Sequence, residues 1–249
     1  MKTIAIYNIK GGVGKTSTAV NVAVLAAGQG QQVLLWDLDP QAAATFLFRV
    51  KPKVRGGAKK LVRGRADVWG LIKGTDHEGL DLLPADFSYR HMDLFLDDAK
   101  KPTRRLSRVL EPMAEDYDLI VLDCPPSISL VSENVFRAAD ALLVPLIPTT
   151  LSLRTLEQLT DFVTDNDLDH LVVLPFFSMV DRRKTLHRDI VATLHDTHPE
   201  ILQTQIPSAT EVERMGVHRD AVSGFAPTSR VALAYEALWA EVTERLTVI

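Results

Sequence analysis

Residues 8–17, with the sequence NIKGGVGKTS, decide the fold, because they follow an apolar run at residues 3–7 and combine glycines with lysines and hydroxyls. Backbone N–H groups can surround a phosphate only where side chains do not block its approach, and Gly11, Gly12 and Gly14 remove those side chains. The pattern therefore predicts a buried strand that leads into a phosphate-binding loop.

The residues that follow supply the other groups that a bound nucleotide needs. Residues 16–27 have the spacing of a helix, whose N-terminus would direct free N–H groups and the positive end of its dipole at the phosphates. Lys15 supplies a charge for the β- and γ-phosphates, Thr16 a hydroxyl for Mg²⁺, and Ser17 a hydroxyl near the α-phosphate. The residues expected to bind the nucleotide are Gly11, Gly12, Val13, Gly14, Lys15, Thr16 and Ser17.

The loop departs from the usual pattern of Gly, four residues and Gly-Lys-Ser/Thr, because Ile9 stands in place of the first glycine and a second lysine, Lys10, follows it. In this deviant form the loop resembles that of the ParA/MinD family of ATPases. The resemblance covers essentially the whole chain and is densest at residues 3–45, 117–126 and 178–212. It implies that Lys10 reaches across a dimer to the nucleotide of the other subunit, which couples ATP binding to dimerisation.

Acidic residues end two further apolar runs, at positions where open α/β sheets bind their ligands. Residues 33–36 lead to Asp37 and Asp39, which the alternation along a strand places on the same side. Residues 117–122 lead to Asp123, as in a Walker B strand, so Asp123 would hold the water shell of Mg²⁺. The resemblance implies that Asp39 orients the attacking water and that Asp37 lies nearer the metal.

The second half of the chain contains candidates for base recognition and for DNA binding. Residues 171–180 form an apolar run followed by Asp-Arg-Arg-Lys-Thr, a segment that in the ParA branch of the family lies beside the base. By this resemblance Met179, Asp181 and Pro207 are adenine-side candidates. The candidates for a DNA-binding face are Arg182, Arg183, Lys184, Arg188, Arg214 and Arg219. For Arg214 and Arg219 taken singly, an exposed salt bridge is the stronger interpretation.

Residues 49–65 carry eight lysines and arginines without one acid and are interrupted by Pro52 and by Gly56-Gly57. We expect a loop here. Two interpretations stay open, because a run of charges alone specifies little: a contact with the phosphates of DNA or with an acidic partner, or a solvated, mobile insertion.

The composition is that of a globular protein, with 249 residues, of which 46% are hydrophobic and 24% charged. Apolar strands alternate with helical segments, so we expect one doubly wound α/β domain over residues 1–249, with a mostly parallel sheet and helices on both faces. Three more strands are expected at residues 80–84, 141–148 and 202–206, and further helices at residues 66–71, 87–96, 104–113, 151–163 and 229–246. No separate DNA-reading domain is expected before the first strand.

Charge and cysteine content restrict the possible partners and compartment. The net charge of −4 means that any binding to nucleic acid depends on a local basic patch. The single cysteine, Cys124, excludes an internal disulfide, argues against iron-sulfur relatives of the fold and fits a reducing, cytoplasmic setting.

The resemblance implies a slow, Mg²⁺-dependent ATPase in which Lys10 and Lys15 neutralise charge in the transition state and Asp39 positions the water. The ATP-bound homodimer would bind DNA without sequence preference, and a partner protein would stimulate hydrolysis and release. Such a cycle positions a plasmid, a chromosome origin or a protein cluster such as a microcompartment along the nucleoid, so we expect a nucleoid-associated protein.

Three alternatives stay open. The first is a metabolic ATP-dependent ligase or amidotransferase component on the same fold. The second is a MinD-like regulator at the membrane, which is disfavoured because the final helix carries Glu236, Glu241 and Glu244 rather than a basic face. The third is a scaffold that binds nucleotide without hydrolysing it.

Overall fold

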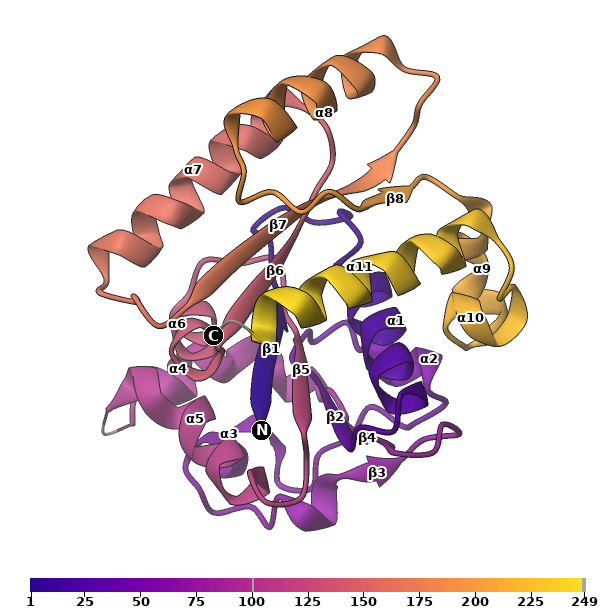
Figure 1. The fold of residues 1–249 in the computed structure, drawn as a ribbon. Coiled ribbons are helices and arrows are strands. Elements are labelled where there is room, and N and C mark those ends of the chain that lie inside the picture. The colour runs from indigo at the N-terminus through magenta and orange to yellow at the C-terminus, as the bar shows by residue number, and fades with distance from the viewer. Residues whose placement is uncertain (100, 248–249) are drawn as a thin grey trace.

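The computed structural model describes residues 1–99 and 101–247. Its strands are β1 (Lys2–Ile6), β2 (Val33–Asp37), β3 (Lys73–Gly74), β4 (Leu80–Leu83), β5 (Leu119–Asp123), β6 (Ala141–Leu146), β7 (Val172–Val180) and β8 (Gln205–Pro207). They form one sheet in the order β3-β4-β2-β5-β1-β6-β7-β8 (Figure 1). Every neighbouring pair runs parallel except β3 and β4, which confirms the predicted fold class.

Helices cover both faces of this sheet. One face is covered by α1 (Lys15–Gly28), α2 (Ala43–Leu47), α9 (Thr210–His218), α10 (Val222–Phe225) and α11 (Arg230–Thr247). The other is covered by α3 (Gly57–Val62), α4 (Met92–Asp97), α5 (Arg105–Leu110), α6 (Leu130–Ala138), α7 (Thr150–Asp165) and α8 (Thr185–Thr197). Short 3₁₀ turns occupy Trp69–Leu71, Phe87–His91, Pro102–Arg104 and Glu111–Met113.

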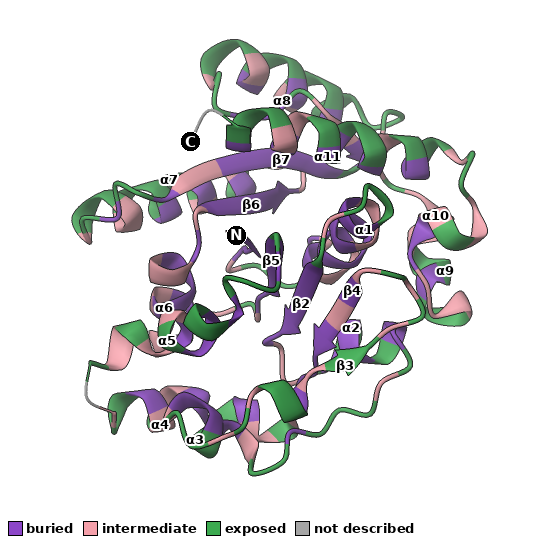
Figure 2. Ribbon diagram, turned by 60° about the horizontal axis from the view of Figure 1, so that its bottom comes forward, coloured by how far each residue is buried: buried purple, intermediate pink, exposed green. Residues whose placement is uncertain are grey.

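The central strands β2, β5 and β6 are buried along their whole length, because each of their faces packs against a helical layer (Figure 2). In β1, Ile4 and Ile6 belong to the core on the α1 side, whereas Ala5 and the adjacent Tyr7 belong to the core on the α6 side. This alternation fixes the register, since a slip by one residue would exchange the two cores. The carboxyl ends of β1, β2 and β5 consequently meet at one edge of the sheet.

The structure corrects the prediction for residues 49–65. They are not one loop, because α3 lies within them and buries Ala58, Leu61 and Val62 against the core. The backbone N–H of Ala58 donates to Ser88 Oγ at 2.8 Å, which ties the start of this helix to the 3₁₀ turn at Phe87–His91. The prediction missed this helix because the many charged residues around it drew attention away from three apolar residues, 58, 61 and 62, which have helical spacing.

Other boundaries shift for identifiable reasons. The last strand is Gln205–Pro207 rather than residues 202–206, because Leu202 is buried in the preceding turn, where its N–H donates to the carbonyl of Pro175 at 2.8 Å. The helix predicted at residues 87–96 is divided between a 3₁₀ turn and α4. The helices α2, α6, α8, α9 and α10 were not predicted.

The packing of α3 can be tested by shortening one buried side chain. Leu61→Ala should lower the free energy of unfolding by about 2–5 kcal/mol, because Leu61 is fully buried and its loss leaves a cavity. Its exposed neighbour offers a matched control, and Lys60→Ala should change stability by less than about 0.5 kcal/mol. Urea titration of both variants measures this, and equal stabilities would mean that residues 49–65 behave as a free loop.

Candidate functional site

The phosphate loop connects β1 to α1 and is shaped by glycines with positive φ. Gly12 has φ 71° and Gly14, which begins α1, has φ 95°, a region that residues with a side chain rarely adopt. A Cβ atom on Gly14 would also approach Ser178 Oγ of β7 to 3.0 Å. Gly14 is therefore required both for the turn and for the close approach of β7 to the loop.

The two lysines of the loop have different environments. Lys15 is buried, and its Nζ donates a hydrogen bond of 2.9 Å to the backbone carbonyl of Lys10. Burial lowers the pKa of Lys15, while the negative charge of Asp123 acts in the opposite direction. The side chain of Lys10 is exposed. Lys15 thus points into the loop, whereas Lys10 is available at the surface.

Asp123 ends β5 as a fully buried carboxylate, and neither of its oxygens has a hydrogen-bond partner among the described residues. Its residue partner in the sheet register is Asp37 of β2. Burial, and then the charge of Asp37, raise the pKa of Asp123 well above its usual range, against the smaller effects of Thr16 and Lys15. An unsatisfied carboxylate beside a threonine hydroxyl is a donor set that suits a hydrated Mg²⁺ ion.

Asp37 is also buried, but its carboxylate is occupied by three hydrogen bonds. Its Oδ2 accepts from the N–H and from the hydroxyl of Thr45, at 2.8 and 2.7 Å, and its Oδ1 accepts from the N–H of Asp39 at 3.1 Å. Burial raises the pKa of Asp37 to about 6, and the hydrogen bonds from Thr45 oppose this shift. These contacts show that Asp37 orders the loop between β2 and α2, while its place near a metal stays a prediction.

Asp39 lies in that loop and is half-buried. Its Oδ1 accepts from the N–H of Gln41 at 2.9 Å, and its own N–H is held by Asp37. The sheet thus brings Asp37, Asp39, Asp123 and Lys15 to one edge, as the sequence pattern predicted.

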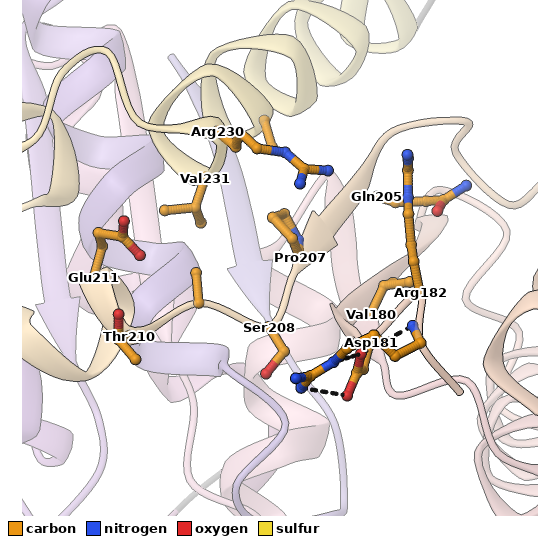
Figure 3. A pocket seen from close by; sticks show the side chains of 13 residues that line it. Val180, Asp181, Arg182, Gln205, Pro207, Ser208, Thr210, Glu211, Arg230 and Val231 are labelled. Atoms are coloured by element: carbon orange, nitrogen blue, oxygen red, sulfur yellow. Dashed lines mark hydrogen bonds and ion pairs between the residues drawn. The ribbon is translucent and has the colours of Figure 1, made fainter. Parts of the chain in front are cut away.

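A cavity of about 620 Å³ lies between the end of β7 and the segment that joins β8 to α9 (Figure 3). Asp181 and Pro207 line it, and Gln205, Glu211 and Arg230 contribute polar groups. The adenine-side role of Asp181 and Pro207 stays a prediction. Met179 is not part of this wall; it has φ 55° and a largely exposed side chain. The structure therefore brings Asp181 and Pro207 together and separates Met179 from them.

The candidates for DNA binding lie in two groups with different constraints. Around the start of α8, Arg182, Lys184 and Arg188 are exposed, whereas Arg183 is held by two hydrogen bonds of 3.0 Å to the Asp181 carboxylate. These bonds lower the pKa of Asp181 to about 2.

The second group is on and after α9. Arg214 contacts the ring of His218 at 3.1 Å. Arg219 donates from Nε to the carbonyl of Phe46 at 2.9 Å and lies 4.5 Å from the centre of the Phe46 ring. Much of the Arg219 side chain is thus engaged in holding α9 against α2.

Sequence reasoning did not identify Thr45 or Ser178 as parts of the site, and it named Arg230 only as a candidate for the DNA-binding face. Thr45 supports Asp37, Ser178 packs against Gly14, and Arg230 lines the cavity at the end of β7. None belongs to a motif with fixed spacing, and Ser178 is hidden in an apolar run. The one available signal was the position of Ser178 near the carboxyl end of a predicted strand.

The sequence of this chain is similar to those of known proteins along almost its whole length. A family model described as an AAA domain matches residues 1–169. The sporulation initiation inhibitor protein Soj of Bacillus subtilis is 32% identical over 247 residues, which cover 97% of this chain and 98% of Soj. The virulence plasmid ParA family protein pGP5-D of Chlamydia psittaci is 30% identical over 253 residues, which cover 99% and 96% of the two chains.

A solved structure of cobyrinic acid a,c-diamide synthase from Mycobacterium smegmatis is also similar. It contains bound ADP and magnesium and is 27% identical to this chain, with a TM-score of 0.81 and coverage of 99% of this chain and 96% of that one.

The unsatisfied carboxylate at the end of β5 leads to a prediction about stability. Without Mg²⁺ or nucleotide, Asp123→Asn should raise the unfolding temperature, because an uncharged amide at this position avoids the cost of burying a charge. The expected rise is at least about 2–4 °C, which corresponds to roughly 1 kcal/mol of stability in a chain of this size. Because burial raises the folded-state pKa of this group, protonation favours the folded chain, so the advantage of the variant should grow as the pH rises.

Thermal unfolding in EDTA at several pH values measures this effect. Asp116→Asn is the matched control, since it makes the same change at an exposed position just before the strand and should leave the unfolding temperature unchanged. A lower unfolding temperature for Asp123→Asn would mean that the charged carboxylate stabilises the fold.

Proposed function

This chain belongs to the ParA/MinD family of ATPases, and on that basis we propose that it is an ATP-driven switch that positions a cargo on DNA. In this proposal ATP and Mg²⁺ bind at the phosphate loop, the ATP-bound chain forms a homodimer, and the dimer binds duplex DNA without sequence preference. A partner protein stimulates hydrolysis, which releases the dimer. The cargo would be a plasmid, a chromosome origin or a protein cluster such as a microcompartment, in the cytoplasm and at the nucleoid.

The residues of the loop support the nucleotide part of the proposal. Gly11 to Ser17 would surround the phosphates, and Lys15 would exchange its bond to the Lys10 carbonyl for the β- and γ-phosphates. Thr16 and Asp123 would hold Mg²⁺, with Asp37 nearby; the bound metal would neutralise phosphate charge. Asp39 would orient the water, and the cavity with Asp181 and Pro207 would accept the base. Met179 would contribute to base binding only from outside that cavity.

The contrast between the two loop lysines is the observation that carries the switch. Lys15 is buried and satisfied within its own loop, whereas the Lys10 side chain is exposed at the same loop. A second cation in that position is free to contact the nucleotide of another subunit. This arrangement would make dimerisation depend on ATP, as the family resemblance implies.

The DNA-binding part of the proposal rests on exposed cations. Arg182, Lys184 and Arg188 carry no ion pair to an acid within the described ranges 1–99 and 101–247, so they would be available to phosphates. Arg183, Arg214 and Arg219 would contribute only after leaving their present contacts. The proposal therefore favours the face at the start of α8.

A second candidate function is a metabolic one, favoured by the likeness to cobyrinic acid a,c-diamide synthase. In that case the chain would use ATP to activate a carboxylate for amide formation, and turnover would require neither DNA nor a partner protein. A membrane-associated regulator has less support. No helix within the described ranges is long and apolar enough to cross a membrane, and α11 packs against the sheet through Leu238, Trp239 and Val242.

Nucleotide-dependent DNA binding is the first prediction of the proposal. Full-length protein should bind a nonspecific duplex with ATP and Mg²⁺ and bind it much more weakly with ADP or without nucleotide. In a salt series, Lys184→Glu/Arg188→Glu should weaken binding and reduce the slope of log affinity against log salt by about 1 for each lost phosphate contact. Lys60→Glu/Arg65→Glu makes the same charge change elsewhere and should bind as wild type. Absence of DNA binding in every nucleotide state would favour the metabolic alternative.

The role of Lys10 gives a separate prediction. Lys10→Ala should remain monomeric with ATP while retaining ATP binding, because the variant loses only the cation that reaches the other subunit. Sedimentation or light scattering measures the mass, and nucleotide titration measures the affinity. Lys15→Ala is the contrasting variant and should lose nucleotide affinity itself. A Lys10→Ala chain that dimerises with ATP as wild type does would exclude the cross-subunit role.

A further inference from the structure

Among the eight basic residues at positions 49–65, two form ion pairs and three others line a groove, and the proposed function uses neither of these sets. Arg49 forms an ion pair with Asp76 at 2.6 Å, and Arg63 forms one with Asp98 at 3.2 Å. These two arginines therefore fasten the segment to the body of the protein. Their contacts lie on exposed sites, so they fix geometry more than they add stability.

The second set has no such partners. Lys51, Lys53 and Arg55 are exposed and form no ion pair with any acid that the structure describes. Together with Lys73 of β3 they line a groove of about 800 Å³. Val50, Gly70, Leu71 and Gly74 complete its lining. The groove thus combines four cations with an apolar floor and contains no acidic residue in its wall.

The groove runs beside the open edge of the sheet. β3 is the outermost strand and both of its residues are exposed (Figure 2). In an antiparallel ladder, opposite pairs that exchange backbone hydrogen bonds alternate with pairs that do not. Thr75 N–H donates to the Leu80 carbonyl, so these two residues form a hydrogen-bonded pair. The next pair, Gly74 and Asp81, is therefore not hydrogen-bonded. The N–H and C=O of Gly74 are therefore directed away from β4, toward the open edge.

From these features we propose that the groove binds an extended acidic segment of a partner protein, which pairs with the edge of β3. Strand addition would satisfy the outward backbone groups of Gly74, and alternate side chains of the segment would face the groove. Carboxylates at those positions complement the four cations that line the groove. The site is separate from the phosphate loop, so its occupancy does not depend on nucleotide.

Charge alone would also suit DNA, but the open edge of β3 favours a peptide. A duplex would contact the four cations through its phosphates, but it offers no peptide backbone that could pair with a strand. An extended peptide is narrow enough to enter beside a strand, since paired strands lie about 4.7–4.9 Å apart. The outward C=O of Gly74 needs a hydrogen-bond donor, which a peptide N–H supplies and a phosphodiester does not, whereas the outward N–H could donate to either.

The test uses the full chain without nucleotide and a pool of fluorescein-labelled octapeptides with glutamate at every second position and small apolar residues between. Fluorescence anisotropy should detect salt-sensitive binding to wild type, and Lys51→Glu/Lys53→Glu should weaken it at least about tenfold. Lys60→Glu/Arg65→Glu carries the same net charge but changes residues outside the groove, and should bind as wild type. Circular dichroism confirms that both variants fold.

Two further measurements distinguish the alternatives. Peptides N-methylated at every second amide should bind at least about tenfold more weakly if the backbone pairs with β3, and unchanged binding would overturn strand addition. A nonspecific 20-base-pair duplex is titrated in parallel. If the Lys51/Lys53 variant loses DNA binding but not peptide binding, or if the acidic pool does not bind, the proposal is wrong. Since no ATP is present, these outcomes are independent of the proposed switch.

Discussion

The structure depends on two carboxylates that the sheet buries side by side. Asp37 and Asp123 end neighbouring strands in the same register, and the buried Lys15 is close enough to Asp123 to influence its pKa. Like charges in a dry interior raise each other's pKa and lower the stability of the fold, unless hydrogen bonds or a bound cation offset their repulsion. Thr45 donates such hydrogen bonds to Asp37, whereas Asp123 has no hydrogen-bond partner among the described residues. The fold thus keeps an unfavourable charge where a cation would be bound.

The phosphate loop is adapted to the same constraint. Lys15 is held by the carbonyl of Lys10 rather than by a carboxylate, so in the proposed function its ammonium would transfer to phosphate oxygens without breaking a buried ion pair. The loop itself is fixed by the left-handed backbone of Gly14 and by the contact with Ser178. Because Ser178 belongs to β7, which also leads to the cavity of Asp181 and Pro207, one strand connects the loop to that cavity.

The basic residues illustrate how the fold assigns different roles to similar side chains. Arg49, Arg63 and Arg219 are engaged in contacts within the chain, whereas Lys51, Lys53 and Lys184 are exposed. An arginine can satisfy several acceptors with one planar group, which suits it to fixing segments to each other. The chain has a net charge of −4, so any attraction of an anionic partner comes from these local groups of exposed cations and not from the charge of the whole molecule.

The sequence by itself determined the fold class, the phosphate loop and the carboxylates of the site, because each depends on local patterns. Glycines, lysines and hydroxyls at fixed spacing define a loop, and an apolar run that ends in an acid defines a buried strand with its ligand end. Only the tertiary structure decided which residues support them. Thr45 and Ser178 act through contacts across the chain, α3 was concealed by the charges around its short apolar stripe, and Met179 was separated from the cavity of Asp181 and Pro207. These outcomes depend on which strands become neighbours and which side chains meet across them, and no periodicity along one segment encodes that information.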